Sequence, residues 1–427
     1  MGWRLMPLLG VLYLVAYIDR SNISFAKLQM LGSLGLSEVA YGLGASLFFI
    51  GYLLFEVPSN VMLHKYGAPR WMARIMFTWG VVTILLAFTR NATMFYILRF
   101  LLGASEAGLY PGVIYYLTLW FPQRHRVRML GYFTVGSSLG NMIGAPICGW
   151  LLDKGGLFGL QGWQLVFVVT GIPSVLLTLV VLFLLPKSPQ ESRFLSSDEK
   201  RWLVDTLSVE GAHARAASRH GSILSLLTEP RVLGMAFYYM MLSISVYGIS
   251  YWLPTLVKGF GVSNTTNGLL NIIPWLLSTI VLATLPARLR ASNHAVVAML
   301  VSALLGVVFF LSSVFLPGHA ARFAALCLGA PCLYLLIPCF WTLPPKFLHG
   351  ARAAAGIAAI NSLGNIGGFI AQNVVPFVKQ TTGSTRAPML VPALCLLIFA
   401  LITTLILRRG NREPQTADDT AVPHSAR

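Results

Sequence analysis

The chain has 427 residues, of which 56% are hydrophobic and only 11% are charged. Soluble domains carry about 25% charged residues, whereas this chain repeats apolar stretches of about 18 residues or more, each long enough to cross a bilayer about 30 Å thick. The net charge of +17 would suggest a nucleic-acid partner for a soluble protein; here it is better explained by basic loops beside a membrane. Continuous apolar runs also exclude a transmembrane β-barrel, whose strands alternate polar and apolar residues.

An all-α membrane protein with twelve transmembrane helices is therefore predicted. The expected spans are residues 4–26, 39–61, 71–89, 93–119, 127–152, 163–185, 231–254, 265–286, 294–316, 321–342, 352–377 and 387–407. The N-terminus lacks a small-residue cleavage site, which indicates a first spanning helix and not a signal peptide. In the long polar segment between the sixth and seventh spans, SSDEKRWLVDTL predicts an amphipathic helix at the membrane surface, with Ser196 and Glu199 at capping-box spacing.

The distribution of basic residues predicts the orientation. With a cytoplasmic N-terminus, 22 of the 31 Lys and Arg residues fall in inside segments, seven in outside loops and two within spans. We expect a multi-pass protein of the cell (inner) membrane with both termini cytoplasmic. The expected parts are an N-terminal six-helix half (1–186), a cytoplasmic linker (187–230), a C-terminal six-helix half (231–410) and a cytoplasmic tail (411–427).

An internal repeat supports two duplicated halves. RMLGYFTVGSSLGNMIG in the fifth span and RAAAGIAAINSLGNIGG in the eleventh match at six positions with a constant offset of 224 residues. Duplicated six-helix halves with the substrate site between them are an architecture of secondary transporters. The glycines at spacing four, among them Gly136, Gly140 and Gly144, are expected to let helices pack closely.

Charges within the spans are concentrated in the first half, at Asp19, Arg20, Glu56, Arg99 and Glu106. A charge at the centre of a membrane helix costs about 2.5–3.5 kcal/mol, so such residues tend to face a cavity or one another. Neighbours on a helix lie roughly 100° apart. We therefore expect Arg20 to face a central cavity while Asp19 turns towards Glu106 or Arg99; a structural ion pair remains the alternative for Arg99, and an interfacial carboxylate for Glu56.

The second half offers aromatic and amide side chains instead of charges, notably Trp341 near the end of the tenth span and Asn361 in the eleventh. A buried Asn in a span needs a helix partner or a ligand. The five cysteines lie in apolar segments without metal-ligand spacing, so we expect no metal and no cofactor. No catalytic cluster stands out, and the chain is not expected to be an enzyme.

Seven motifs follow one another along the chain: YIDRSNISFAKL, EVPSN, RFLLGASEAGLYPG, WFPQRHRVR, WLP, FWTLPP and GIAAINSLGNIGG. In these motifs the sequence resembles the major facilitator superfamily and, within it, the anion:cation symporter family. The resemblance covers essentially the whole chain. Members that take up tartrate, phthalate or hydroxyphenylacetate are the most similar.

The resemblance implies roles for individual residues. It implies proton coupling at Asp19 and Glu106. It implies substrate contacts at Arg20, Tyr52, Arg99, Trp341 and Asn361. It also implies a gating loop between the second and third spans, at His64, Lys65, Gly67 and Arg70, where His64 replaces the usual Asp of the superfamily.

The expected function is proton-coupled symport of a small organic carboxylate into the cell, by a monomer in the lipid bilayer whose partners are the anion and protons. A proton-independent exchanger or facilitator of the same fold remains the alternative. A transport-dead nutrient receptor is disfavoured because the loops are short and the sequence shows no signalling domain. Whether protons or sodium ions drive transport, and which acid is carried, are not determined by these residues.

Overall fold

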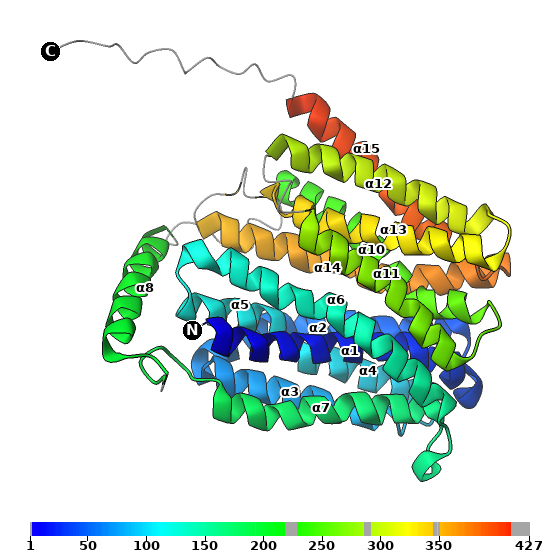
Figure 1. The fold of residues 1–427 in the computed structure, drawn as a ribbon, viewed down its shortest axis with the longest axis horizontal. Coiled ribbons are helices and arrows are strands. Elements are labelled where there is room, and N and C mark those ends of the chain that lie inside the picture. Colours follow the sequence, from blue (N-terminus) through cyan, green and yellow to red (C-terminus); the bar gives the residue numbers. More distant parts are fainter. Residues whose placement is uncertain are drawn as a thin grey trace.

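The computed structural model describes residues 2–192, 194–217, 229–285, 292–344, 348 and 351–410. The predicted tail (411–427) and part of the predicted linker lie outside these ranges. The described residues are almost entirely helical, and most of the helices run lengthwise through one elongated bundle (Figure 1). The N-terminus and the linker helix α8 lie at one end of the bundle, which we call the near end; the opposite end is the far end.

The helices of the first half account for the first six predicted spans. They are α1 (Gly2–Leu34), α2 (Glu38–Tyr66), α3 (Ala68–Leu86), α4 (Ala92–Glu106), α5 (Leu109–Trp120), α6 (Gln123–Asp153) and α7 (Gly162–Leu184), with the short 3-10 helix η1 (Leu157–Gly159) before α7. The helix α8 (Ser197–Ala217) follows in the linker. Its predicted capping box is present, because the Glu199 amide donates to Ser196 Oγ and the Ser196 amide donates to Glu199 Oε2.

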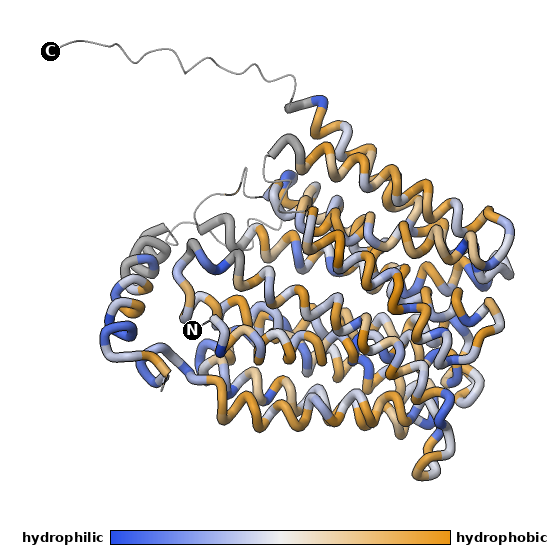
Figure 2. The backbone as a smooth tube through the Cα atoms, viewed as in Figure 1, coloured by the Kyte–Doolittle hydropathy of each residue, from blue (hydrophilic) through white to orange (hydrophobic). Residues whose placement is uncertain are grey.

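The second half contains the other six. They are α10 (Pro230–Lys258), α11 (Asn264–Thr284), α12 (Ser292–Phe315), α13 (His319–Phe340), α14 (Ala351–Thr382) and α15 (Leu390–Gly410), with the 3-10 helix η3 (Ala387–Met389) before α15. Hydrophobic residues dominate the helices of the bundle, while α8 carries many hydrophilic ones (Figure 2). Ten helices of the described chain are long and apolar enough to cross a membrane. The other two predicted spans, the third and the eleventh, correspond to α3 with its arginines and α14 with its amides.

The two halves pack by the same plan, as the repeat predicts. In the first half α1 packs on α6, α2 on α4 and α3 on α7. The corresponding helices of the second half pair in the same way, α10 with α14, α11 with α13 and α12 with α15. The halves meet along three seams, α6 against α11, α2 against α14 and α1 against α10.

The repeated glycines Gly140 and Gly364 lie in equivalent contacts, whereas Gly144 meets α1 and its counterpart Gly368 meets Phe49 of α2. A Cβ on Gly136, Gly140 or Gly144 of α6 would collide with α1. A Cβ on Gly364 of α14 would collide with Tyr239 of α10 in the same way. The predicted packing role of these glycines is confirmed, because only a hydrogen in place of a side chain leaves room for the neighbouring helix.

Several helices differ from the predicted spans, and α2 and α14 each run about five residues further than expected. The first helix continues to Leu34 and not to residue 26, so Lys27 lies inside a helix and not in a loop. The fourth span, predicted as one helix over 93–119, is broken between α4 and α5. Gly108 sits in the break with a φ of 91°, a left-handed conformation that glycine adopts without steric cost.

Candidate functional site

An ion pair between α1 and α4 lies at the centre of the first half. Arg20 donates from Nε to Glu106 Oε1 at 2.8 Å, and its Nη2 lies 2.5 Å from the same oxygen. The Glu106 side chain is only 1% exposed, whereas Arg20 retains 23% exposure. The second carboxylate oxygen, Glu106 Oε2, is buried and has no hydrogen-bond partner in the structure.

Aromatic rings surround the Arg20 guanidinium. Its central carbon lies 5.3 Å from the ring centre of Tyr17, 5.6 Å from that of Phe48 and 5.8 Å from that of Tyr52. Cations are attracted to aromatic faces at such distances. The structure therefore places Tyr52, a predicted substrate contact, beside Arg20.

The predicted direction of Asp19 is wrong. Its carboxylate is 1% exposed, and its hydrogen bonds within the described residues come from α1, α3 and α7, with none to Glu106 or Arg99. Oδ2 accepts from Trp79 Nε1 at 2.5 Å and from Thr83 Oγ1 at 2.9 Å, and Oδ1 accepts from Asn22 Nδ2 at 2.8 Å. Because Arg20 follows Asp19 directly, the turn of the helix that brings Arg20 to Glu106 carries Asp19 to the other side.

Arg99 is buried, with 4% exposure, in a different contact from the expected one. Its Nη2 donates to the backbone carbonyl of Ala45 in α2 at 2.9 Å, and its guanidinium carbon lies 5.2 Å from the Phe48 ring centre. Among the ion pairs of the described residues, none joins Arg99 to Glu106. The Arg99 Nε atom is buried without a hydrogen-bond partner.

The break in the fourth span comes directly after Glu106. Ser59 of the EVPSN motif donates to the Ala107 carbonyl at 2.6 Å and accepts from Trp71 Nε1 at 2.9 Å. A Cβ on Gly108 would collide with the Ser59 side chain. The motif thus provides a hydrogen-bond donor for a carbonyl at the broken helix, and inside a membrane such backbone groups need a protein partner.

The predicted gating loop is a tight corner between α2 and α3. Gly67, with a φ of 85°, ends one helix and precedes the other. The His64 ring lies 4.0 Å from the ring of Tyr115, and Lys65 lies over the ring of Tyr66. Arg70 is exposed. These two described contacts both lie within the first half.

Among the described contacts, none joins the predicted residues of the second half to the ion pair. Trp341 packs against Tyr239, with ring centres 5.0 Å apart. Asn361 is half-buried in α14 beside Ser362, whose hydroxyl donates to Glu56 Oε2 at 3.1 Å across the α2–α14 seam. Glu56 therefore joins the two halves, an arrangement that the sequence did not indicate.

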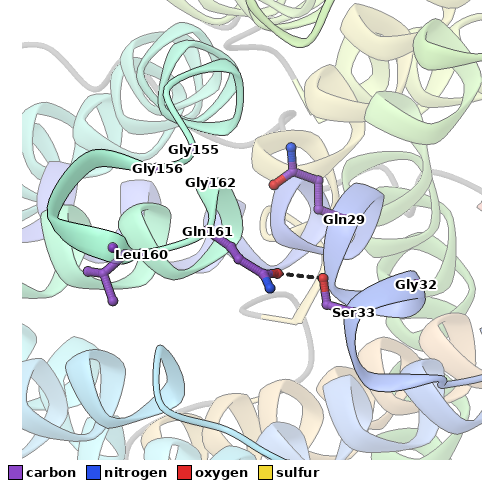
Figure 3. Close-up of a pocket in the computed structure, with 9 residues that line it drawn as sticks. Gln29, Gly32, Ser33, Gly155, Gly156, Leu160, Gln161 and Gly162 are labelled. Carbon is purple, nitrogen blue, oxygen red and sulfur yellow. Dashed lines mark hydrogen bonds between the residues drawn. The ribbon is translucent and has the colours of Figure 1, made fainter.

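A hollow of about 650 Å³ lies at the far end, between α1 and the loop before α7 (Figure 3). Its polar side chains are already satisfied, since Gln29 donates to the Leu152 carbonyl and Ser33 donates to Gln161. The nine lining residues, many of them glycines, include no charged side chain. We therefore do not assign a ligand to this hollow, and the charged cluster around Arg20 is the stronger candidate site.

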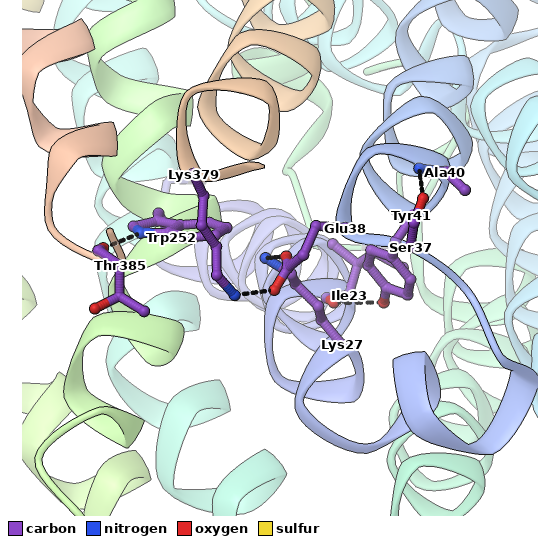
Figure 4. Close-up of polar contacts among 9 residues, drawn as sticks. All are labelled: Ile23, Lys27, Ser37, Glu38, Ala40, Tyr41, Trp252, Lys379 and Thr385. Atoms are coloured by element: carbon purple, nitrogen blue, oxygen red, sulfur yellow. Dashed lines mark hydrogen bonds and ion pairs between the residues drawn. The ribbon is translucent and has the colours of Figure 1, made fainter. Parts of the chain in front are cut away.

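A second charged cluster, missed by the sequence reasoning, joins the halves at the far end (Figure 4). Lys27 of α1 lies 2.6 Å from Glu38 Oε2, and Lys379 of α14 pairs with Glu38 Oε1. The Lys27 ammonium also lies 3.6 Å from the centre of the Trp252 ring. We call Lys27, Glu38 and Lys379 the far-end clasp. Both lysines were expected in loops, where such a pairing leaves no signal in the sequence.

Neutral hydrogen bonds reinforce closure of the far end. Asp153, at the end of α6, accepts from Asn264 Nδ2 and from both the amide and the hydroxyl of Thr265, each at 2.7 Å. Glycines bring the same helices close, because a Cβ on Gly149 would collide with the backbone of α11. The two halves are thus fastened together at the far end by polar contacts on two of the three seams.

Comparison with known proteins gives consistent results. The family described as Major Facilitator Superfamily matches residues 9–372. A quinolone resistance transporter of Acinetobacter baumannii is 40% identical over 96% of this chain and 95% of its own length. A putative tartrate transporter of Agrobacterium vitis is 40% identical over 95% of this chain and 93% of its own length.

The fold is also similar to solved structures of low sequence identity. The Escherichia coli xylose transporter XylE, in a partially occluded inward-open conformation, superposes with a TM-score of 0.74, 12% identity and coverage of 95% of this chain and 98% of its own. A bacterial homologue of the human lysosomal transporter Spinster gives a TM-score of 0.73, 16% identity and coverage of 94% and 96%. The predicted fold class, two six-helix halves in an all-α membrane protein, is confirmed.

Proposed function

The chain belongs to the major facilitator superfamily, and from that premise we propose that it is a proton-coupled symporter of a small organic carboxylate. The membrane-embedded pair of Arg20 and Glu106 is the observation that carries this proposal. Arginine binds carboxylates through paired, charge-assisted hydrogen bonds. Here one carboxylate already occupies it, and that carboxylate is a side chain able to take up a proton.

Coupling follows from competition for Arg20. When Glu106 is ionised, it holds the guanidinium. When Glu106 takes up a proton, its attraction for Arg20 weakens, and Arg20 becomes available to the carboxylate of an incoming acid. The partial exposure of Arg20 and the three rings around it suit a small anion that has to be desolvated as it binds.

Asp19 is proposed as a second proton carrier. Its hydrogen bonds come from neutral groups, and no ion pair among the described residues includes it. Its charge can therefore change without breaking a salt bridge. Because its partners Trp79 and Thr83 lie on α3 and Asn22 on α1, a change of charge at Asp19 would alter the packing of these two helices.

The names of similar proteins support the substrate class. Two relatives of Agrobacterium vitis, each at about 40% identity, are named putative tartrate transporters. Tartrate is a dicarboxylate, and in this proposal Arg20, which keeps 23% exposure, binds one of its carboxylates. The relative named as a quinolone resistance transporter favours a second candidate, in which the same site exports a larger anionic compound.

The orientation is proposed from the basic residues. The near end, which carries α8 and the N-terminus, would face the cytoplasm of a bacterial inner membrane. The far end, closed by contacts between the halves, would then be the outer end. Inward electrical driving force adds about 2.3 kcal/mol per net positive charge per 100 mV, so uptake is driven when protons outnumber the charges on the acid.

The test is uptake into proteoliposomes. A thermal-shift screen with tartrate, sugar acids, phthalate and hydroxyphenylacetate identifies a ligand, whose uptake is then measured with and without an inward proton gradient. We expect accumulation only with the gradient. Glu106→Gln and Asp19→Asn should abolish accumulation, while Asp205→Asn, an exposed acid on α8, should not change it.

Each alternative predicts a different result. If both variants still concentrate the acid under a pH gradient, the assignment of the proton carriers is wrong. Equilibration that needs no gradient identifies a facilitator, and flux that requires an anion on the other side identifies an exchanger. Net accumulation of a quinolone inside inside-out vesicles, with no uptake of small acids, identifies the exporter.

A further inference from the structure

The far-end clasp brings two ammonium groups onto one carboxylate. Each oxygen of Glu38 holds one lysine, Oε2 holding Lys27 and Oε1 holding Lys379. The three side chains together carry one excess positive charge. This charge lies at the proposed outer end.

The three residues belong to different halves. Lys27 and Glu38 lie on α1 and α2 of the first half, whereas Lys379 lies on α14 of the second. Lys27 is 1% exposed and is held over Trp252, while Lys379 is 26% exposed. If the halves separate at this end, Lys27 leaves the Trp252 ring of α10 but can stay paired with Glu38, whereas Lys379 loses its carboxylate.

The clasp is the charge-dependent part of far-end closure. The other described polar contacts across this end join Asp153 to neutral groups of Asn264 and Thr265. Those bonds do not involve a cation, so an anion arriving from outside finds no positively charged group there to bind. At the clasp, by contrast, a small carboxylate can compete with Glu38 for the Lys379 ammonium group.

We propose that Lys379 is an outer capture site for a small carboxylate anion, and that Glu38 occupies this site whenever the far end is closed. An incoming carboxylate displaces Glu38 from Lys379, and this displacement breaks the one ion pair of the clasp that crosses between the halves. Arrival of the anion thus favours opening of the outer end. The capture role rests on the proposed function, the import of an organic anion.

The experiment measures the opening of the far end directly. Spin labels are attached at Gly32→Cys and Gln380→Cys, two exposed positions on opposite halves, in a variant lacking the five native cysteines. The distances between the two spin labels are then measured in lipid nanodiscs. Glu38→Gln is expected to shift the distribution to longer distances, while Lys154→Gln, an exposed lysine at the same end, is expected to leave it unchanged. An unchanged distribution in Glu38→Gln overturns the clasp.

A charge exchange separates closure from capture. The double variant Glu38→Lys with Lys379→Glu again sets one carboxylate, now at position 379, against two lysines, the introduced one and Lys27. An ion pair across the halves is thereby restored, so the short distances should return. The double variant leaves a carboxylate on the second half after opening, so capture of an anion should fail. For the acid that the protein transports, we expect KM from the outer side to rise about tenfold with kcat little changed. A KM equal to that of the unmodified protein overturns the capture role.

L-tartrate serves as the probe that does not require transport. In the labelled protein with an intact clasp, tartrate should increase the longer-distance population, and uncharged erythritol should not. No change with tartrate contradicts capture of a small carboxylate, whether or not tartrate is carried. If proteoliposomes show no uptake of any acid, the proposed function fails, and the distance measurements still decide the clasp.

Discussion

Replacing Arg20 with Gln should destabilise the protein mainly through the charge that it leaves behind. Glu106 is 1% exposed, and only Arg20 pairs with it among the described ion pairs. Breaking a buried pair costs about 3–5 kcal/mol when the remaining charge is left buried. Arg20 itself keeps 23% exposure, so solvent already weakens the pair, and we expect a loss of about 2–3 kcal/mol for Arg20→Gln.

The reverse change should cost less. Glu106→Gln leaves the charge on Arg20, which can reach solvent and still faces three aromatic rings, so we expect about 1 kcal/mol. In the double variant Arg20→Gln with Glu106→Gln neither charge remains. Its loss should therefore be smaller than the sum of the single losses, with a coupling free energy of about 1–2 kcal/mol.

The assay is reversible unfolding in mixed micelles with increasing dodecyl sulfate, read by tryptophan fluorescence. The pair Arg126–Glu210, at 29% and 27% exposure, provides the matched control, and its coupling should stay below about 1 kcal/mol. Additive losses in the Arg20–Glu106 cycle would contradict this prediction, because they would mean that neither charge depends on the other. The double variant should recover stability without recovering transport.

Three further changes test the surroundings of the site. Ser59→Ala removes a donor to the broken fourth span, and we expect a loss of about 1–3 kcal/mol in the same unfolding assay; a loss near zero would mean that the freed carbonyl finds another partner. Gly140→Ala pushes a methyl group against the backbone of Leu14, so overpacking should cost about 1–3 kcal/mol and slow transport; unchanged stability would show that the seam is loose. Trp79→Phe keeps the ring but removes the donor to Asp19; proton uptake per substrate, measured with a pH dye, should fall, and an unaltered ratio would count against Asp19 as a proton carrier.

Much of the fold could be predicted from simple physical constraints. A bilayer of fixed thickness requires apolar runs of a certain length, and these runs located the spans to within a few residues, apart from helices that extend beyond the membrane such as α1. Glycines at spacing four identified close helix contacts, because small residues are what such contacts need. The break at Gly108 gave no such signal, since the apolar run continues through it.

The candidate site was predicted in its residues but not in its arrangement. Intramembrane charge pointed to Arg20, Asp19 and Glu106, because burying charge is costly wherever it occurs. Which of two adjacent residues meets Glu106 depends on how α1 is rotated against α4, and one sequence does not contain that angle. The far-end clasp was missed for a related reason, since Lys27 and Lys379 are more than 350 residues apart.

The glycine seam between α1 and α6 has a mechanical consequence. Three glycines place the backbone of α6 against that of α1 over the stretch that ends near Asp19 and Arg20. A contact made of backbone has few side-chain rotamers to rearrange, so these two helices are expected to move as one rigid rod. Sliding or tilting during a transport cycle must then be absorbed where this rod meets α10 and α11. The charged residues of α1 would thus move together with α6 and keep their positions relative to it.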